Sequence, residues 1–525
     1  MYNNINNIPA EKFQFATRND LYHDSKFETK PVSYFQGAFQ RFSKNKGAVV
    51  GGVVIAILVL FAIFAPFFTP FQPAYYDMVY AYVTPKSNLF ANSGIDFWDG
   101  SKLKDTNYIG YLKDVALAAE TGREIIKGEV EISEDGSTYS YRYDTYFGVG
   151  FGKYKIISLE EYNDIQRYQN ETGRQVLYPV VKAADRPTLE KNKYDANIYY
   201  KMENPKASVI RPKLDKDGNI IPNYWKYEAG DASSLVADYN SLRIEGEDGV
   251  EEKGKQYFYA YGRKVDGGIE VRTEYYEYYI YQHNEVLKDG ITEPLFLFGT
   301  TETGKDIFAC LAYGARFSFI FATVVAMVNF VVGVIWGSIS GYSGGKIDLF
   351  MERFAEILGS VPTMIVITLL KYHMGTSSQV LVLFIAFFAT GWIGMAGRTR
   401  MQFYRFKNQE YVLAARTLGA RDSRIMFKHI FPNGLGTIVT SVALVIPSMI
   451  YSETSLSYLG IINLEAGNTT SVGTLIAAGQ KSIMANAGFV ALFPCVFLVL
   501  LMLSFNLFGN GLRDAFNPSL RGTED

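Results

Sequence analysis

The chain has 525 residues, a formal net charge of −2 and 48% hydrophobic residues, averages that are typical of a soluble protein. They conceal two populations, because several long stretches are apolar and nearly free of charge, whereas one large block is polar and rich in tyrosine. Since about 20 apolar residues cross a bilayer, the sequence excludes a wholly soluble protein and indicates an integral membrane protein with a sizeable water-exposed domain.

The chain begins with a polar tail, 1–46, whose basic residues Arg41, Lys44 and Lys46 precede the first apolar run. That run, 47–69, is longer than the apolar core of a signal peptide and starts too far along the chain, so it is predicted to be a retained membrane span. Basic residues beside a span favour the cytoplasmic side. The tail is therefore predicted to be cytoplasmic.

A polar block, 70–295, follows and contains no stretch that could span a membrane. With the tail inside, this block is predicted to be extracytoplasmic and is large enough for its own core. Asp135-Gly136 and Asp266-Gly267 each separate two strand-forming runs, which favours tight two-residue hairpin turns. The block is expected to fold as an α+β or mainly β domain.

A cluster of tyrosines near the end of this block has two interpretations. Tyrosines on half-buried strand faces would be structural, whereas an exposed tyrosine surface would suit contact with a partner. The sequence leaves both open for Tyr275, Tyr276, Tyr278, Tyr279 and Tyr281.

The placement of cysteine and histidine limits the chemistry of the chain. Cys310 and Cys495 lie in or beside apolar segments, so no disulfide framework is expected in the polar block. The four histidines are far apart and show no metal-ligand spacing. No nucleophile–base constellation stands out, so we predict no catalytic, metal-binding or cofactor-binding residues in this chain.

The remaining core, 296–525, contains five further apolar runs. The second to sixth spans are predicted at 317–341, 349–372, 380–397, 434–451 and 489–508. Pro362 lies inside the third span, and charges at its start, Glu352 among them, are expected near cytoplasmic headgroups or facing protein. A moderately polar loop with Glu453 and Glu465 is predicted before the last span, and the spans are expected to hold almost no ionisable residues away from their ends.

A strongly basic loop, 398–432, joins the fourth and fifth spans. It carries eight basic residues against only Glu410 and Asp422, and such an excess marks a short loop as cytoplasmic. This agrees independently with the charge beside the first span and places both termini inside. The predicted fold is a polytopic α-helical membrane protein with six spans and an extracytoplasmic insertion.

The basic loop has the pattern of two short helices. Residues 411–418 have helical spacing, and Gly419 suits the left-handed conformation that ends a helix. A second short helix is predicted over 422–431, stopped by Pro432. The loop is either a plain interfacial connection or, in the interpretation we favour, a docking element for a partner.

No phosphate-binding loop of the Gly-x-x-x-x-Gly-Lys-Ser/Thr type occurs in the sequence. The glycine-rich stretch GYSGGKID has neither the required spacing nor the hydroxyl residue after its lysine. The chain is therefore predicted not to hydrolyse ATP itself, and any driven transport takes its energy from another subunit or from an ion gradient.

The basic loop resembles the EAA motif of ATP-binding-cassette (ABC) importer permeases, which reads Glu-Ala-Ala, three residues, Gly, nine residues and Ile-x-Leu-Pro. The matching positions are Ala414, Ala415, Gly419 and Pro432. Leu413 stands at the position of the motif's Glu, with Glu410 one turn earlier, and His429 and Phe431 replace the Ile and the Leu.

Further stretches resemble the C-type subunit of oligopeptide and dipeptide permeases. They are 41–52, 297–319, 453–461 and 505–518. Thr301 and Lys305 replace an Asp and an Arg of the family's pattern, and Asn510 and Asn517 stand where Asp is common. The resemblance covers roughly 35–70 and 296–520, and the polar block has no counterpart in the usual family member.

The resemblance implies a division of labour. The chain would form a pathway with a second, B-type permease, and two partner ATPase subunits would bind ATP and Mg. The helix at 410–419 would couple ATPase closure to opening of the pathway, through Glu410, Ala414, Ala415, Gly419 and Pro432. A lipid-anchored extracellular binding protein that touches 70–295 would deliver oligopeptides or dipeptides for import across a bacterial plasma membrane, and no nucleic acid is expected as a partner.

Other functions stay open at this point. Related permeases carry nickel or other small solutes, and a secondary transporter driven by an ion gradient would need ionisable residues in mid-span. A receptor or enzyme anchored by its spans would leave the basic loop unexplained. The block 70–295 either braces or captures the binding protein or the partner permease, or is a tolerated insertion without a transport role.

Overall fold

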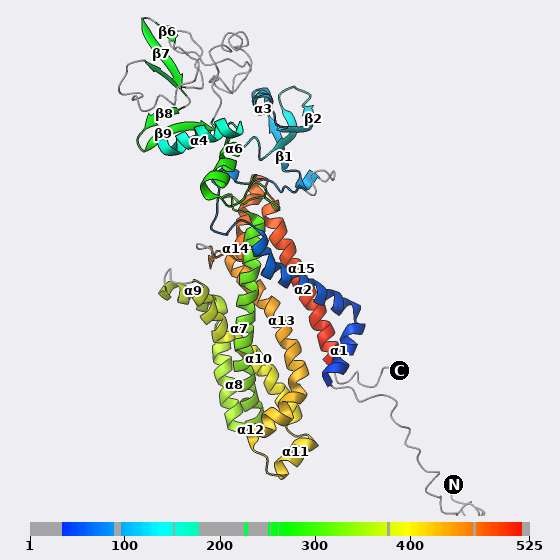
Figure 1. Ribbon diagram of the computed structural model, residues 1–525. Helices are drawn as coiled ribbons and strands as arrows, with labels where there is room; N and C mark the ends of the chain where they lie inside the picture. Colours follow the sequence, from blue (N-terminus) through cyan, green and yellow to red (C-terminus); the bar gives the residue numbers. More distant parts are fainter. Residues whose placement is uncertain are drawn as a thin grey trace, which may run out of the picture.

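A computed structural model describes residues 34–88, 96–150, 153–177, 225–228, 250–252, 254–260, 262–374, 379–465 and 469–516. Figure 1 shows a bundle of long helices with strands gathered beyond one end. This described part contains five helices that are long and apolar enough to cross a membrane, and a sixth span if one bent pair is counted. The predicted class, a polytopic helical membrane protein with an inserted domain that contains strands, is confirmed.

The bundle depends on close approach of its long helices. These helices are α2 (Lys46–Phe68), α7 (Ile307–Ser343), α10 (Gln379–Phe406), α13 (Phe431–Tyr458) and α15 (Phe489–Phe516). On α7, a Cβ added to Gly337 would lie 2.2 Å from the carbonyl oxygen of Ala396 on α10. Small residues at such crossings let membrane helices pack backbone against backbone.

The third predicted span is a bent pair of helices rather than one continuous helix. α8 (Gly345–Gly359) and α9 (Thr363–Met374) differ in direction by 68°. Pro362 lies at the break between them. A proline lacks the N–H that continues a helix, and its ring clashes with the preceding turn, so the apolar run bends there.

The helix of the fifth span extends beyond the predicted limits at both ends. It begins with α12 (Asp422–Arg424), continues through a π-helical turn, η8 (Ile425–Ile430), and ends at Tyr458. Pro432 lies in the first turn of α13, so the prediction that it stops a helix is wrong. A wider turn is the kind of local adjustment that accommodates proline within a membrane helix.

Part of the polar loop predicted before the last span is helical. α14 (Val472–Ser482) begins with a reciprocal cap between Ser471 and Thr474, in which each side chain accepts from the other residue's backbone N–H. Such a capping box satisfies two N–H groups that a helix start leaves without partners. The short helix therefore forms although its sequence is not strongly apolar.

The strands of the inserted block form three small antiparallel sheets, with strand orders β1-β3-β2, β4-β9-β8 and β5-β7-β6. The strands are β1 (Ser101–Thr106), β2 (Ile126–Ile132), β3 (Tyr139–Asp144), β4 (Lys153–Ile157), β5 (Trp225–Glu228), β6 (Val250–Glu252), β7 (Lys255–Ala260), β8 (Gly262–Val265) and β9 (Gly268–Thr273). The helices of the block include α3 (Tyr108–Thr121) and α4 (Leu159–Thr172).

The two Asp-Gly turns differ in width. β8 and β9 are joined by Asp266-Gly267, the two-residue turn that was predicted. The turn at Asp135-Gly136 is wider, contrary to the prediction, since residues 133–138 separate the last paired positions of β2 and β3. The Asp135 carboxylate accepts hydrogen bonds from the hydroxyls of Ser133 and Ser137 at 2.5 and 2.8 Å, and such local side-chain bonds favour the longer turn.

The tyrosine cluster forms a helix, so its interpretation as strand is wrong. α6 (Tyr275–Tyr281) is buried along its length, and its five tyrosines are at most 8% exposed. This burial also contradicts the interpretation as a contact surface. The rings belong to a core shared with Phe71, Tyr80 and Phe296, and the one charged residue of α6, Glu277, is buried in ion pairs with Arg123 and Arg174.

The inserted block is fastened to the bundle through the segment that precedes α7. The backbone N–H of Thr300 donates to the carbonyl oxygen of Val83 at 3.0 Å, and the Thr300 hydroxyl accepts from the N–H of Val83 at 2.9 Å. Phe298 in the same segment stacks on Phe493 of α15, with ring centroids 3.9 Å apart. Both backbone and aromatic contacts therefore hold the block against the helix ends.

Asp306, at the end of this segment, is expected to give stability an unusual pH dependence. Its carboxylate is 4% exposed and caps α7 by accepting from the N–H groups of Phe308 and Ala309 at 3.2 and 3.1 Å. Burial raises the pKa of Asp306 to about 7. The folded chain then holds a proton that the unfolded chain releases, so stability is expected to fall by up to about 4 kcal/mol as pH rises from about 4 to 7.

The measurement is the Tm of the purified chain between pH 5 and pH 8. Asp306→Asn should flatten the fall in Tm across this interval, because asparagine keeps a capping oxygen and does not titrate. Asp135→Asn, at a fully exposed turn, is the control and should leave the slope unchanged. An Asp306→Asn slope equal to that of the wild type would contradict the prediction.

Candidate docking site

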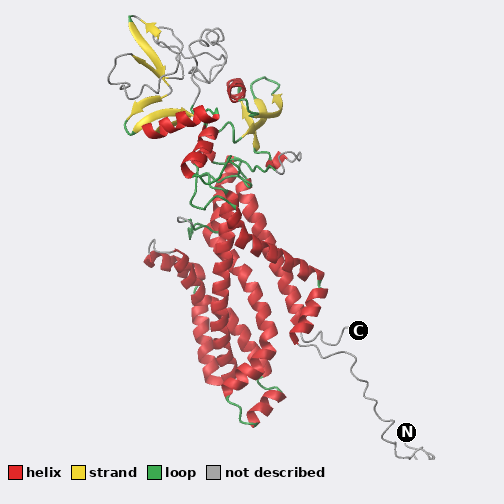
Figure 2. Cartoon of the chain, viewed as in Figure 1, coloured by secondary structure: helices red, strands yellow, loops and turns green. Residues whose placement is uncertain are grey.

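The basic loop forms an elbow at the end of the bundle away from the strands (Figure 2). α10 ends at Phe406, and α11 (Glu410–Thr417) follows after a short turn. Gly419 has a φ of 75°, in the left-handed region that favours glycine, and turns the chain toward α12. The elbow therefore has the helix–glycine–helix order expected from the sequence.

One face of α11 packs against the bundle. Val412 is fully buried in a cluster with Phe403, Ile425, Met426 and Ile430. Burying a valine side chain contributes about 1.5–3 kcal/mol relative to leaving it exposed. This single residue therefore fixes which face of α11 points away from the bundle.

Polar contacts tie the elbow to the end of α7. The Tyr342 hydroxyl donates to the Asp422 carboxylate at 2.5 Å and accepts from an Arg416 guanidinium nitrogen at 3.3 Å. The ammonium group of Lys407 donates to the carbonyl oxygen of Gly341 at 2.9 Å. The elbow is thus held from both of its short helices, which favours movement as one body with α7.

The outward face of α11 has a small side chain at its centre and apolar side chains on either side. Glu410, Ala414 and Thr417 are exposed and, at spacings of four and three residues, lie on one face. Leu413 and Leu418 flank this face and are 46% and 87% exposed. Leu413, Ala414 and Leu418 therefore give α11 an exposed apolar surface on the side away from the bundle.

The structure separates the residues predicted for docking. Glu410 and Ala414 share the outward face, whereas Ala415 is half-buried on the side of α11, and Gly419 is exposed just beyond its end. Pro432 is exposed in the first turn of α13, apart from this face. Sequence reasoning missed Leu418 as a candidate contact, although an apolar residue beside a helix-ending glycine is a recognisable signal.

A buried carboxylate joins three helices behind the elbow. Asp348 of α8 accepts from the Arg400 guanidinium at 2.7 Å through two nitrogens, from the Tyr404 hydroxyl at 2.5 Å and from the Ser340 hydroxyl. Arg400 also lies 3.1 Å from the Glu352 carboxylate. Glu352 therefore faces protein, one of the two placements expected, but the sequence did not single out Asp348 or its partners.

Glu453 lies inside a helix and not in the predicted loop. It is fully buried in α13 and accepts from the hydroxyls of Ser318 at 3.3 Å and Ser457 at 3.0 Å. Glu453 lies near the end of α13, which ends at Tyr458, so it does not contradict the expectation that ionisable residues are rare away from the span ends. Serine hydroxyls from two helices supply the hydrogen bonds that a buried carboxyl group requires.

Two family profiles match this chain. The family described as "Binding-protein-dependent transport system inner membrane component" matches residues 333–522, which include the elbow. The family described as "N-terminal TM domain of oligopeptide transport permease C" matches residues 33–85, which include α2. Most of the inserted block lies between the two matched ranges.

Individual relatives are permease subunits. The oligopeptide transport system permease protein OppC of Bacillus subtilis is 41% identical over 43% of this chain and 72% of its own length. The dipeptide permease protein DppC of the same organism is 39% identical over 43% and 69%, and OppC of Escherichia coli K12 is 40% identical over 43% and 72%. A structure of the MetNI methionine ABC transporter aligns at 16% identity over 39% of this chain and 94% of the other, with a TM-score of 0.31.

Proposed function

This chain belongs to the binding-protein-dependent permeases of ABC importers as a relative of the OppC and DppC subunits, and on that premise we propose that it forms part of the import pathway for oligopeptides or dipeptides. The substrate class follows the names of its relatives. A second permease subunit, two ATP-binding subunits that hold ATP and Mg, and a peptide-binding protein complete the proposed transporter. The elbow and both termini are cytoplasmic in this proposal.

The proposed coupling depends on the outward face of α11. Val412 is buried while Ala414, Leu413 and Leu418 are exposed, so the helix presents a small-centred apolar face away from the bundle. A partner that grips this face would move α11 and α7 together, because Tyr342 bonds to both short helices of the elbow. Transport then uses rigid-body displacement of packed elements, with ATP hydrolysed by the partner subunits.

The inserted block is proposed to brace or capture the peptide-binding protein or the partner permease. Its attachment supports this role, since Thr300 and Phe298 fasten it to the segment that enters α7 and to α15. A freely hinged insertion would transmit no force to the bundle. A block fixed at these contacts would hold a bound protein at a fixed position relative to the helix ends.

The test of the coupling proposal is Ala414→Trp in the complete transporter. Ala414 is exposed, so the larger side chain leaves the fold of this chain intact but fills the space that a docked partner needs. Peptide uptake is expected to fall by at least about tenfold, while the amount of purified permease and its Tm stay unchanged. Peptide binding to the receptor protein should also be unaffected.

Ala414→Ser is the matched control at the same position. Serine adds one oxygen atom and should leave uptake within about twofold of the wild type, because little volume is added. Wild-type uptake by the Ala414→Trp variant would refute docking on this face. A loss of uptake with both substitutions would point to a sensitive fold and not to a partner.

A further inference from the structure

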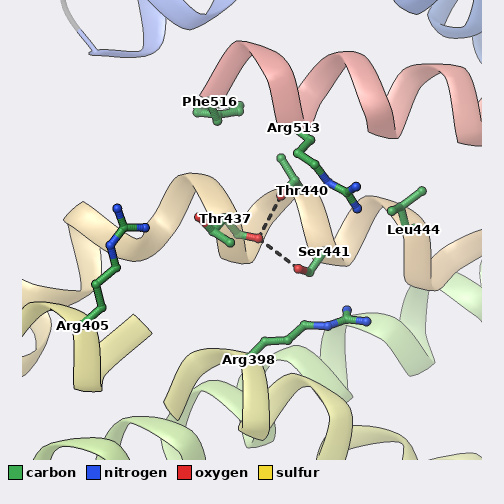
Figure 3. Close-up of a pocket in the computed structure, with 8 residues that line it drawn as sticks. All are labelled: Arg398, Arg405, Thr437, Thr440, Ser441, Leu444, Arg513 and Phe516. Carbon is green, nitrogen blue, oxygen red and sulfur yellow. Dashed lines mark hydrogen bonds between the residues drawn. The ribbon is translucent and has the colours of Figure 1, made fainter. Parts of the chain in front are cut away.

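A second feature of the bundle lies near the elbow, in a cleft between α10, α13 and α15. Figure 3 shows side chains from these three helices around it. The cleft has a volume of about 430 Å³. It is lined by Arg398, Arg405, Thr437, Thr440, Ser441, Leu444, Arg513 and Phe516.

The cleft carries positive charge that no lining residue balances. Arg398 and Arg405 project from α10 and Arg513 from α15, and all three are exposed. Among the described residues that line the cleft there is no Asp or Glu, and none of the three arginines forms an ion pair with another described residue. Arg400, by contrast, is paired with Asp348 on another side of α10. Three unpaired guanidinium groups in one cleft favour an anionic occupant.

Two of the three hydroxyl groups that line the cleft, those of Thr440 and Ser441, already donate within α13. Thr440 and Ser441 donate to the backbone carbonyl oxygen of Thr437 at 2.8 and 3.0 Å (Figure 3). A bound anion would therefore receive its strongest hydrogen bonds from guanidinium groups, whose planar N–H pairs match phosphate oxygens. Leu444 lies one turn further along α13 and adds an apolar wall.

The neighbouring helix α1 (Tyr34–Lys44) indicates that the cleft lies at the level of lipid headgroups. The Arg41 guanidinium donates to the carbonyl oxygen of Ala515 at 3.0 and 2.7 Å, which fixes α1 beside the last turn of α15. Phe39 is 71% exposed on α1, and Lys44 is exposed at its end. A short helix with exposed aromatic and basic side chains is typical of the membrane interface.

We propose that this cleft binds the phosphate headgroup of an acidic phospholipid of the inner leaflet, held by Arg398, Arg405 and Arg513. The apolar wall at Leu444 and Phe516 would contact the start of an acyl chain. Basic pockets between membrane helices on the cytoplasmic side suit such headgroups. The proposal rests on the orientation given above, in which this end of the bundle is cytoplasmic.

The experiment measures lipid retained by the purified, complete transporter in native mass spectrometry. Detergent micelles carry either phosphatidylglycerol or zwitterionic phosphatidylethanolamine. Retained phosphatidylglycerol is expected to fall by at least about tenfold in the triple variant R398Q/R405Q/R513Q. The control R421Q/R424Q/K428Q removes the same charge from exposed positions of the elbow outside the cleft and should retain phosphatidylglycerol within about twofold of the wild type.

Several results would overturn the lipid proposal. Equal retention by the two triple variants, or equal retention of both lipids, would mean that the cleft has no such site. Complete displacement by millimolar inorganic phosphate would assign it to a free anion. Loss of the second permease subunit from R398Q/R405Q/R513Q with phosphatidylglycerol retention unchanged would assign the cleft to a protein contact. Because lipid retention is measured without transport, these outcomes are separate from failure of the Ala414→Trp test.

Discussion

Replacing Asp348 with alanine is expected to destabilise the bundle by about 3–5 kcal/mol, the usual cost of removing one partner from a buried ion pair. The Asp348 carboxylate is 8% exposed and accepts hydrogen bonds from α7 and α10. Its removal leaves Arg400 with only the more exposed Glu352 and leaves the Tyr404 and Ser340 hydroxyls without this acceptor. The measurement is the Tm of the purified chain in detergent, together with resistance of the elbow to protease.

Arg353→Ala, on the same helix, is the control for this prediction. Arg353 pairs with Glu356 at 2.5 Å, but the two side chains are 67% and 53% exposed. Exposed pairs of this kind contribute at most about 1 kcal/mol, so the Tm should hardly change. Similar decreases in Tm in Asp348→Ala and Arg353→Ala would contradict the prediction that Asp348 stabilises the bundle through its buried ion pair. In Asp348→Ala/Arg400→Ala, the loss should be smaller than the sum of the single losses, because the two residues act as a pair.

Gly304→Ala is expected to have the second large effect, loosening the inserted block from the bundle. Gly304 has a φ of 75°, and an added Cβ would lie 1.7 Å from the backbone oxygen of Asp77. Since both atoms belong to the backbone or are fixed to it, the two segments have to separate. The strain of placing alanine in the left-handed conformation and this clash are together expected to lower the free energy of unfolding by about 3–5 kcal/mol. The measurement is the rate of proteolysis within the block, which should rise as its anchoring weakens.

Gly290→Ala separates the two causes. Gly290 has a φ of 81°, so alanine suffers the same left-handed strain, but an added Cβ would meet no atom within 4 Å. Its cost is expected to be only about 1–2 kcal/mol. If both variants were equally stable, close approach to Asp77 would not be what fastens the block.

Features that depend on local chemistry were predictable from the sequence. The apolar runs located the long helices because a span needs length and hydrophobicity and little else. Gly419 was identified as a helix end, and it has the left-handed conformation that such an end requires. The turn at Asp266-Gly267 followed from residue type alone. The family resemblance was likewise carried by short local motifs, one in the elbow and others at 41–52, 297–319, 453–461 and 505–518.

Features that depend on distant partners were not predictable. The tyrosines of α6 do not alternate regularly with polar residues, and the side chains that enclose them, Phe71 and Phe296 among them, lie in other segments of the chain. Glu453 was predicted to lie in a loop, because a charged residue suits a loop unless it has a buried partner. Its partner on α7, Ser318, is 135 residues away and cannot be recognised from the local sequence. Asp348 and Arg400 are 52 residues apart. Each of these pairings requires knowledge of which helices are neighbours.

The continuity of α7 has a consequence for how the two ends of the protein communicate. This helix has 37 residues without a break, which is roughly 55 Å at 1.5 Å per residue. Tyr342 meets the elbow at one end, and the segment around Thr300 meets the inserted block at the other. α7 is thus a rigid, continuous connection between the elbow and the inserted block. If binding at one of these two surfaces changes the affinity of the other for its ligand, thermodynamic linkage requires that binding at the second surface change the affinity of the first by the same factor.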